Sequence, residues 1–151
     1  MIVSAGLLMY KIERKVFVYV VHPGGPYFRN KDKGWWTIPK GLPNPDEDLL
    51  NTAIREFEEE TGIKSIPPYL DLGNVKQKGG KIVNCWAFKI DSSVEIEFKS
   101  NNFLMEWPPA SGKNVLFPEV DKAEWMEIEK AMLYINERQK VFLDRLNDLV
   151  L

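Results

Sequence analysis

The chain has 151 residues, 44% of them hydrophobic, and its 20 basic and 22 acidic side chains give a net charge of -2. This length and composition suit one globular domain with its own core, and the balanced charge excludes a general attraction to nucleic acid or to an anionic membrane surface. No specific nucleic-acid binding is therefore expected. No apolar run reaches the roughly 18 residues of a membrane span, and none resembles a signal peptide. A single cysteine, Cys85, excludes a disulfide framework, so we expect a cytoplasmic location.

The N-terminal region is rich in strand-forming residues. Residues 4–22 are expected to form two strands joined by a polar turn at Glu13 and Arg14. Residues 23–34 contain paired glycines between prolines and are expected to be a loop. Residues 35–39 should be extended, because a residue that precedes proline is biased away from the helix. His22, at the end of the second strand, is interpreted as a structural residue and not a catalytic one.

A helix is predicted after the turn-rich segment 40–48, and it runs to Thr61. Two residues are possible N-caps. Asn44 would form a capping box with Glu47, and Asp48 is an equally suitable N-cap. Gly62 is expected to end the helix in the left-handed conformation.

The rest of the chain mixes strands and helices. Two strands are expected near residues 69–76 and 81–90, and Cys85 is interpreted as a core residue of the second. Segment 91–118 shows no clear pattern, although its proline-rich part, 107–118, is expected to be loop. A short strand is expected at 123–128, followed by one or two helices. This order predicts an α/β fold without the regular alternation of a doubly wound sheet.

The central helix ends with four glutamates in five positions. At about 100° per residue, Glu56, Glu59 and Glu60 lie within roughly 100° of one another, whereas Glu58 points nearly the opposite way. Like charges at these spacings repel, and the helix dipole disfavours anions near the C-terminus. A bound cation would offset both costs, and oxygen ligands favour Mg²⁺, Mn²⁺ or Ca²⁺ over zinc. This segment alone is also compatible with a solvated acidic helix end.

The wider segment GLPNPDEDLLNTAIREFEEETGI, residues 41–63, is similar to the signature of the Nudix hydrolases. That signature fixes a glycine, a glutamate after five intervening residues, and then an Arg-Glu pair, a Glu-Glu pair, a glycine and a final apolar residue. The chain matches every fixed position, namely Gly41, Glu47, Arg55, Glu56, Phe57, Glu59, Glu60, Gly62 and Ile63. The resemblance implies a single Nudix hydrolase domain over residues 1–151. It also implies an α/β/α sandwich around a mixed β-sheet.

The resemblance further implies a metal site that holds Mg²⁺ or Mn²⁺. Its expected ligands are Glu56, Glu59, Glu60 and the backbone carbonyl of Lys40. Glu47 would support the metal site or its loop, or would simply cap the helix. The metal would neutralise diphosphate oxygens, orient the substrate and lower the pKa of bound water.

The catalytic set expected from the same resemblance consists of Glu59, Glu56, Arg55 and Glu119. Arg55 would hold the glutamate cluster in place electrostatically. The group that activates water is either a signature glutamate or a distal one from a later loop. Glu119 is the first distal candidate and Glu106 the second, and each could equally be a surface carboxylate.

Substrate binding is expected outside the signature. The segment WTIPKG, residues 36–41, resembles the same region of dinucleoside polyphosphate and diphosphoinositol polyphosphate hydrolases. Lys40 and Lys81 could neutralise phosphates. Four aromatic residues could stack on a base or could simply pack in the core or loop: Tyr27, Phe28, Trp35 and Trp36.

The expected function is metal-dependent cleavage of a diphosphate linkage in a small nucleoside polyphosphate, with dinucleoside polyphosphates favoured. The alternatives are a nucleoside triphosphate or nucleotide-sugar (ADP-ribose) pyrophosphatase and a non-catalytic nucleotide-sensing module. Segments 21–26 and 100–121 resemble a bacterial subgroup of predicted pyrophosphohydrolases, which adds no substrate. The insert 101–118 could form a lid. The sequence sets no oligomeric state.

Overall fold

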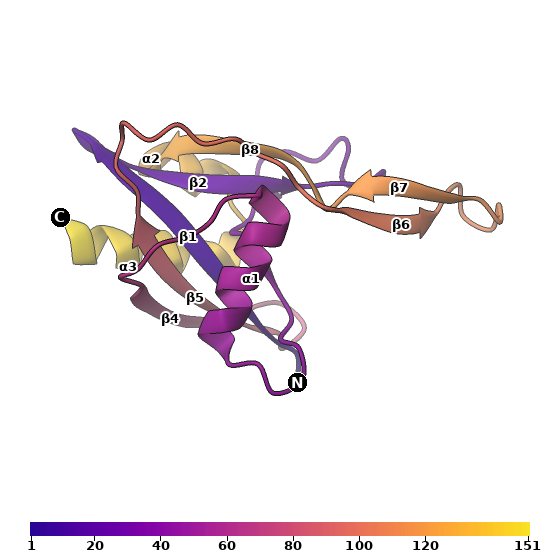
Figure 1. Ribbon diagram of the computed structural model, residues 1–151, viewed down its shortest axis with the longest axis horizontal. Helices are drawn as coiled ribbons and strands as arrows, with labels where there is room; N and C mark the ends of the chain where they lie inside the picture. The colour runs from indigo at the N-terminus through magenta and orange to yellow at the C-terminus, as the bar shows by residue number, and fades with distance from the viewer.

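A computed structural model describes residues 1–151 and shows a mixed six-stranded sheet with helices on both faces (Figure 1). Five strands lie in the order β4-β5-β1-β2-β8, and the short β3 pairs with β1. β1 and β5 are parallel, and the other pairs are antiparallel. The strands span Val3–Glu13 (β1), Lys15–Pro23 (β2), Lys40–Gly41 (β3), Leu70–Lys76 (β4), Ile82–Lys89 (β5) and Val120–Glu127 (β8). The expected α/β fold with a mixed sheet is confirmed.

Helices cover the two faces of the sheet separately. α1 (Leu49–Thr61) packs on one face, and α2 (Ile128–Tyr134) and α3 (Lys140–Val150) pack on the other, with a short 3₁₀ helix at Glu137–Gln139 between them. The central strand β1 therefore contributes to two cores: Leu8 belongs to the core with α3, and Leu7 to the core with α1. A strand buried on both faces needs a nearly continuous apolar run, which the sequence of β1 provides. No helix is long and apolar enough to cross a membrane.

The start of α1 decides between the two possible N-caps, Asn44 and Asp48. Asp48 is the N-cap, and its side chain accepts a hydrogen bond from the backbone N–H of Asn51 at 2.8 Å. Gly62 ends the helix with φ = 75°, and its N–H donates to the carbonyl of Glu58 at 2.7 Å. The prediction for Gly62 is confirmed, and of the two possible N-caps the structure uses Asp48.

The expectation that residues 107–118 are loop is wrong for the last part of the segment. Residues Asn114–Pro118 form β7, which pairs with β6 (Asn102–Glu106) in a two-stranded hairpin that projects from the domain (Figure 1). Prolines flank the short strand pattern of β7 and mask it in the sequence. The strand forms because Phe117 and its neighbours pair across the hairpin with Phe103 and β6, a contact that no local pattern reveals.

Candidate active site

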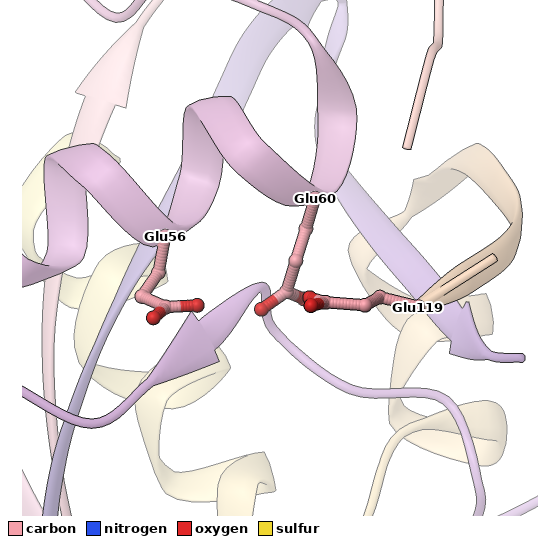
Figure 2. Close-up of side chains that lie close together, drawn as sticks. All are labelled: Glu56, Glu60 and Glu119. Atoms are coloured by element: carbon pink, nitrogen blue, oxygen red, sulfur yellow. The ribbon is translucent and has the colours of Figure 1, made fainter. Parts of the chain in front are cut away.

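Three carboxylates converge beside β3. Glu56 and Glu60 extend from α1, and Glu119 reaches them from the junction between β7 and β8 (Figure 2). One carboxylate oxygen from each lies within 4.8 Å of the others, and Glu60 is 8% exposed. The helix is oriented by Ala53 and Phe57, which are fully buried against the sheet and so turn the faces of Glu56 and Glu60 toward β3.

Gly41 makes room for this cluster. A Cβ atom built on Gly41 would lie 2.1 Å from the carboxyl carbon of Glu56 and 2.3 and 2.4 Å from its two oxygens. Any side chain at this position would therefore push the Glu56 carboxylate away. This contact gives the first glycine of the signature its physical role.

Burial makes the cluster electrostatically costly. Burial raises the pKa of Glu60 to about 9, and the charges of Glu56 and Glu119 act in the same direction. Burial also raises the pKa of Glu56 and of Glu119. Lys40 partly compensates the charge of Glu60, although burial lowers the pKa of the Lys40 ammonium as well. One ammonium beside three carboxylates leaves negative charge that a cation would neutralise.

The donor set fits a hard divalent cation. All three side chains offer carboxylate oxygen, which Mg²⁺ and Mn²⁺ prefer, and no sulfur or imidazole ligand belongs to the cluster. Mg²⁺ binds through one or two carboxylates while it keeps several waters, so this cluster offers enough protein ligands for such an ion.

Arg55 holds the signature together. Its Nε and Nη2 donate to the two oxygens of Glu47, each at 2.9 Å, and Nη1 donates to Glu56 at 2.9 Å. Nη1 also contacts Glu59 at 3.3 Å, and Nη2 donates to the carbonyl of Leu42 at 2.9 Å. Hydrogen bonds from Arg55 are the main cause that lowers the pKa of Glu47 to about 2. This network ties the loop before α1 to the helix.

Two predicted metal ligands, Glu59 and Glu47, lie outside the three-carboxylate cluster. The side chain of Glu59 is 40% exposed and faces Arg55. Glu47 also accepts hydrogen bonds from the Thr52 hydroxyl and from the Asn44 backbone N–H. Its position is that of a residue that organises the loop and the start of the helix.

Glu119 is positioned by a segment that the sequence analysis did not single out. The last carbonyls of α1, on Glu59 and Thr61, accept hydrogen bonds from the backbone N–H groups of Asn101 (3.0 Å) and Lys99 (2.8 Å). The carbonyl of Asn101 then accepts the backbone N–H of Glu119 at 2.9 Å. Residues 99–101 thus fix the distal carboxylate relative to the helix that carries the other two. No local sequence signal marks this bridge.

The predicted substrate-binding residues occupy different environments. Trp36 is 5% exposed, and its indole N–H donates to Asp32 at 2.9 Å, so its ring lies in the interior. Tyr27 is 58% exposed and packs edge-on against Trp107. Lys81 is exposed and lies close enough to Lys40 for its charge to lower the pKa of Lys40.

Two further candidates are accounted for by local contacts. Glu106, the second distal candidate, lies in the projecting hairpin and accepts the backbone N–H of Ala110 at 2.9 Å. His22 is buried, and its ring nitrogens contact a carboxylate oxygen of Asp121 (2.8 Å) and the carbonyl of Lys31 (2.6 Å). His22 therefore fastens the loop 23–34 to the sheet.

A cavity of about 300 Å³ opens beside the carboxylates. It is formed by the loop 23–34, by the strand that carries Lys40, by α1 and by the base of the hairpin. Its lining residues are Pro23, Gly24, Phe28, Thr37, Lys40, Glu60, Phe103, Glu119 and Val120.

Comparison with known proteins identifies the family. The model of the NUDIX domain matches residues 2–146, so the chain belongs to this family. The human protein "Nucleoside diphosphate-linked moiety X motif 6" is 35% identical over 101 residues, which cover 66% of this chain. The rat "Bis(5'-nucleosyl)-tetraphosphatase [asymmetrical]" is 35% identical over 79 residues, or 48% of the chain. The matched stretches make up 28% of the human relative and 54% of the rat relative.

Solved structures share the fold. A C. elegans Ap4A hydrolase binary complex superimposes with a TM-score of 0.67 at 21% identity, covering 99% of this chain and 98% of that one. The NUDIX domain of Shewanella oneidensis NrtR, complexed with ADP ribose, gives 0.67 at 13% identity and covers 100% of this chain and 89% of that one. At these identities the similarity concerns the fold.

Proposed function

We propose that the protein is a divalent-metal-dependent pyrophosphohydrolase that cleaves a diphosphate linkage in a small nucleotide. The observation that carries the proposal is the cluster of Glu56, Glu60 and Glu119, of which Glu60 is buried and the other two half-buried, beside a cavity of about 300 Å³. Membership of the NUDIX family and relatives named for nucleoside diphosphate-linked substrates support the same reaction class.

Each residue of the site has a proposed role. Glu56, Glu60 and Glu119 would hold Mg²⁺ or Mn²⁺, with the Lys40 carbonyl as a further ligand and Glu59 and Glu47 as outer supports. The bound metal would supply charge neutralisation for the diphosphate oxygens and acidity for the attacking water. Arg55 keeps Glu56 in place, and the Lys40 ammonium is available to a substrate phosphate. Glu119 or Glu59 would accept the proton of the attacking water, because a carboxylate close to the bound water can act as a general base.

Dinucleoside polyphosphates are the favoured substrates within this class. The relative from rat is named for a dinucleoside tetraphosphate, and the C. elegans neighbour is an Ap4A hydrolase. Nucleoside triphosphates and ADP-ribose are the next candidates, the latter because one neighbour binds ADP ribose. We also propose that the protein belongs to the bacterial subgroup of predicted pyrophosphohydrolases. Lys81 and the exposed ring of Tyr27 would contact the distal parts of a long substrate. Trp36 is not assigned this role, because its ring is buried.

A non-catalytic sensor of nucleotides is the second candidate function. The observation in its favour is that the structural neighbour NrtR holds ADP ribose in a NUDIX domain. The complete carboxylate cluster favours the enzyme, because binding alone does not require three carboxylates gathered around one point.

Turnover with defined products tests the proposal. The protein is incubated with Mg²⁺ and, separately, a dinucleoside tetraphosphate, each nucleoside triphosphate and ADP-ribose in ¹⁸O-labelled water, and the products are identified by mass spectrometry. We expect Mg²⁺-dependent cleavage that identifies both the substrate and the phosphorus attacked. Glu60→Gln should abolish it, whereas Glu58→Gln, on the exposed side of the same helix, should not. Binding of a nucleotide with no turnover at high protein concentration would favour the sensor.

A further inference from the structure

The cavity beside the carboxylates combines two kinds of lining. Lys40, Glu60 and Glu119 provide charge, whereas Phe28 from the loop and Phe103 from β6 provide aromatic surface. Both phenyl side chains are half-buried. The Phe103 ring lies next to Gly25, and the backbone N–H of Phe28 donates to the Gly25 carbonyl at 3.4 Å. A Cβ on Gly25 would approach the Phe103 ring at 3.3 Å, so the glycine leaves room for this ring at the cavity wall.

The two aromatic walls are fastened to each other. The backbone N–H of Gly24 donates to the carbonyl of Glu119 at 2.9 Å, and a Cβ on Gly24 would lie 2.0 Å from the carbonyl oxygen of Pro118. Farther out, the rings of Tyr27 and Trp107 pack edge-on with centroids 5.4 Å apart. The loop and the hairpin therefore form one preassembled wall that ends at Glu119.

We propose that Phe28 and Phe103 form a ring-binding subsite that receives the base of a nucleotide whose diphosphate lies at Glu56, Glu60 and Glu119. This inference rests on the proposed function and assigns the hairpin β6–β7 as its specificity element. A planar base stacks favourably on an aromatic side chain, and removing one such partner costs about 1–3 kcal/mol per base. The volume of about 300 Å³ is at the lower limit of ligand pockets, so the subsite accepts one ring system and leaves the second half of a dinucleotide outside.

The subsite selects for an aromatic ring and not for a particular base. The Thr37 hydroxyl is already engaged with the Ile38 carbonyl and the Gln139 side chain, and the Gly24 N–H is engaged with Glu119. Lys40 lies with the carboxylates, where phosphate is expected. The remaining walls offer no side-chain donor to read the edge of a base, so recognition depends on stacking. Polyphosphates without an aromatic ring, including diphosphoinositol compounds, are therefore disfavoured.

Binding of two matched ligands tests the subsite. Isothermal titration calorimetry in Mg²⁺ compares adenosine 5′-(α,β-methylene)triphosphate with inorganic tripolyphosphate, which lacks the ring. Phe103→Ala and Phe28→Ala should each weaken binding of the nucleotide by about 5- to 150-fold and change tripolyphosphate binding by less than about twofold. Leu104→Ala is the matched control, because Leu104 neighbours Phe103 in β6 and is 66% exposed. Phe103→Trp should restore binding of the nucleotide.

Several outcomes would overturn the subsite. The first is an equal loss of affinity for the nucleotide and for tripolyphosphate, and the second is unchanged affinity for the nucleotide in both alanine variants. The third is a wild type that binds the nucleotide no more tightly than tripolyphosphate. The fourth is an affinity more than about a hundredfold higher for one of the four common bases than for the others. Turnover, measured separately, distinguishes this failure from failure of the proposed function. A protein that cleaves nucleotides but is insensitive to Phe103→Ala lacks the subsite alone. A protein that binds the nucleotide through these rings without cleaving anything retains the subsite and lacks the enzymatic function.

Discussion

Replacing Arg55 with lysine keeps the positive charge and removes the planar guanidinium group. The guanidinium uses all three nitrogens, with two bonds of 2.9 Å to Glu47 and one to Glu56, whereas an ammonium is a single point of donation. Two charge-assisted hydrogen bonds would be lost, each worth about 1.5–3 kcal/mol when fully formed. Because the Arg55 side chain is 26% exposed, we expect a smaller total, about 2–3 kcal/mol.

This loss is measurable in two ways. For a domain of this size, each kcal/mol lowers Tm by about 2–4 °C, so Arg55→Lys should lower the melting temperature by roughly 4–12 °C. Turnover should fall by about tenfold or more, because Glu56 loses the donor that orients it. Circular dichroism melting and steady-state kinetics measure the two effects. Arg138→Lys is the control, since this exposed arginine makes no side-chain hydrogen bond or ion pair and should change stability by less than about 0.5 kcal/mol.

The two readouts separate the possible results. An unchanged melting temperature would refute the role of the bidentate contact with Glu47. A lowered melting temperature with unchanged turnover would show that Arg55 supports the loop but does not position Glu56.

Three other predictions concern the carboxylates and the core. Gly41→Ala should displace the Glu56 carboxylate, whose atoms lie 2.1–2.4 Å from the new Cβ, and should weaken Mn²⁺ binding measured by electron paramagnetic resonance; unchanged affinity would refute the packing role of Gly41. In metal-free protein Glu60 keeps its proton up to a pKa of about 9, whereas unfolded protein releases it near 4.5, so stability should decline as pH rises between these values. Glu60→Gln should flatten this decline and abolish the increase in Tm that Mg²⁺ causes in the wild type. Burial raises the pKa of the Cys85 thiol, so iodoacetamide at pH 8 should label it far more slowly in folded than in guanidine-unfolded protein, and equal rates would contradict its burial.

Local chemistry explains why much of the fold could be predicted. The apolar run of β1, the polar turn at Arg14 and the left-handed cap at Gly62 are properties of short segments, and the structure shows each one. The strand β7 was missed because its stability comes from pairing with β6 across residues 107–113. Pairing between segments leaves little trace in either segment alone.

The structure groups the predicted carboxylates differently from the helical wheel. The helical wheel grouped Glu59 with Glu56 and Glu60, because a wheel records only the direction in which each residue leaves the helix. In the folded protein the Glu59 side chain contacts Arg55 and lies outside the cluster. Glu119 supplies the third carboxylate of the cluster. The wheel cannot include a neighbour from outside the helix, such as Glu47 in the preceding loop or Glu119 at the base of the hairpin.

The sequence by itself determined an α/β order of elements with one acidic helix, because periodicity, caps and turn residues act over a few positions. The mixed sheet was expected only from the resemblance to the Nudix signature. It also determined the family, since the fixed residue types from Gly41 to Ile63 lie at fixed spacing. Only the tertiary structure decided which carboxylates meet and which rings line the cavity. Glu119 joins the helix through the bridge at residues 99–101, and Phe28 and Phe103 line the same cavity. Those contacts join residues far apart in the chain, and their geometry depends on how the whole domain packs.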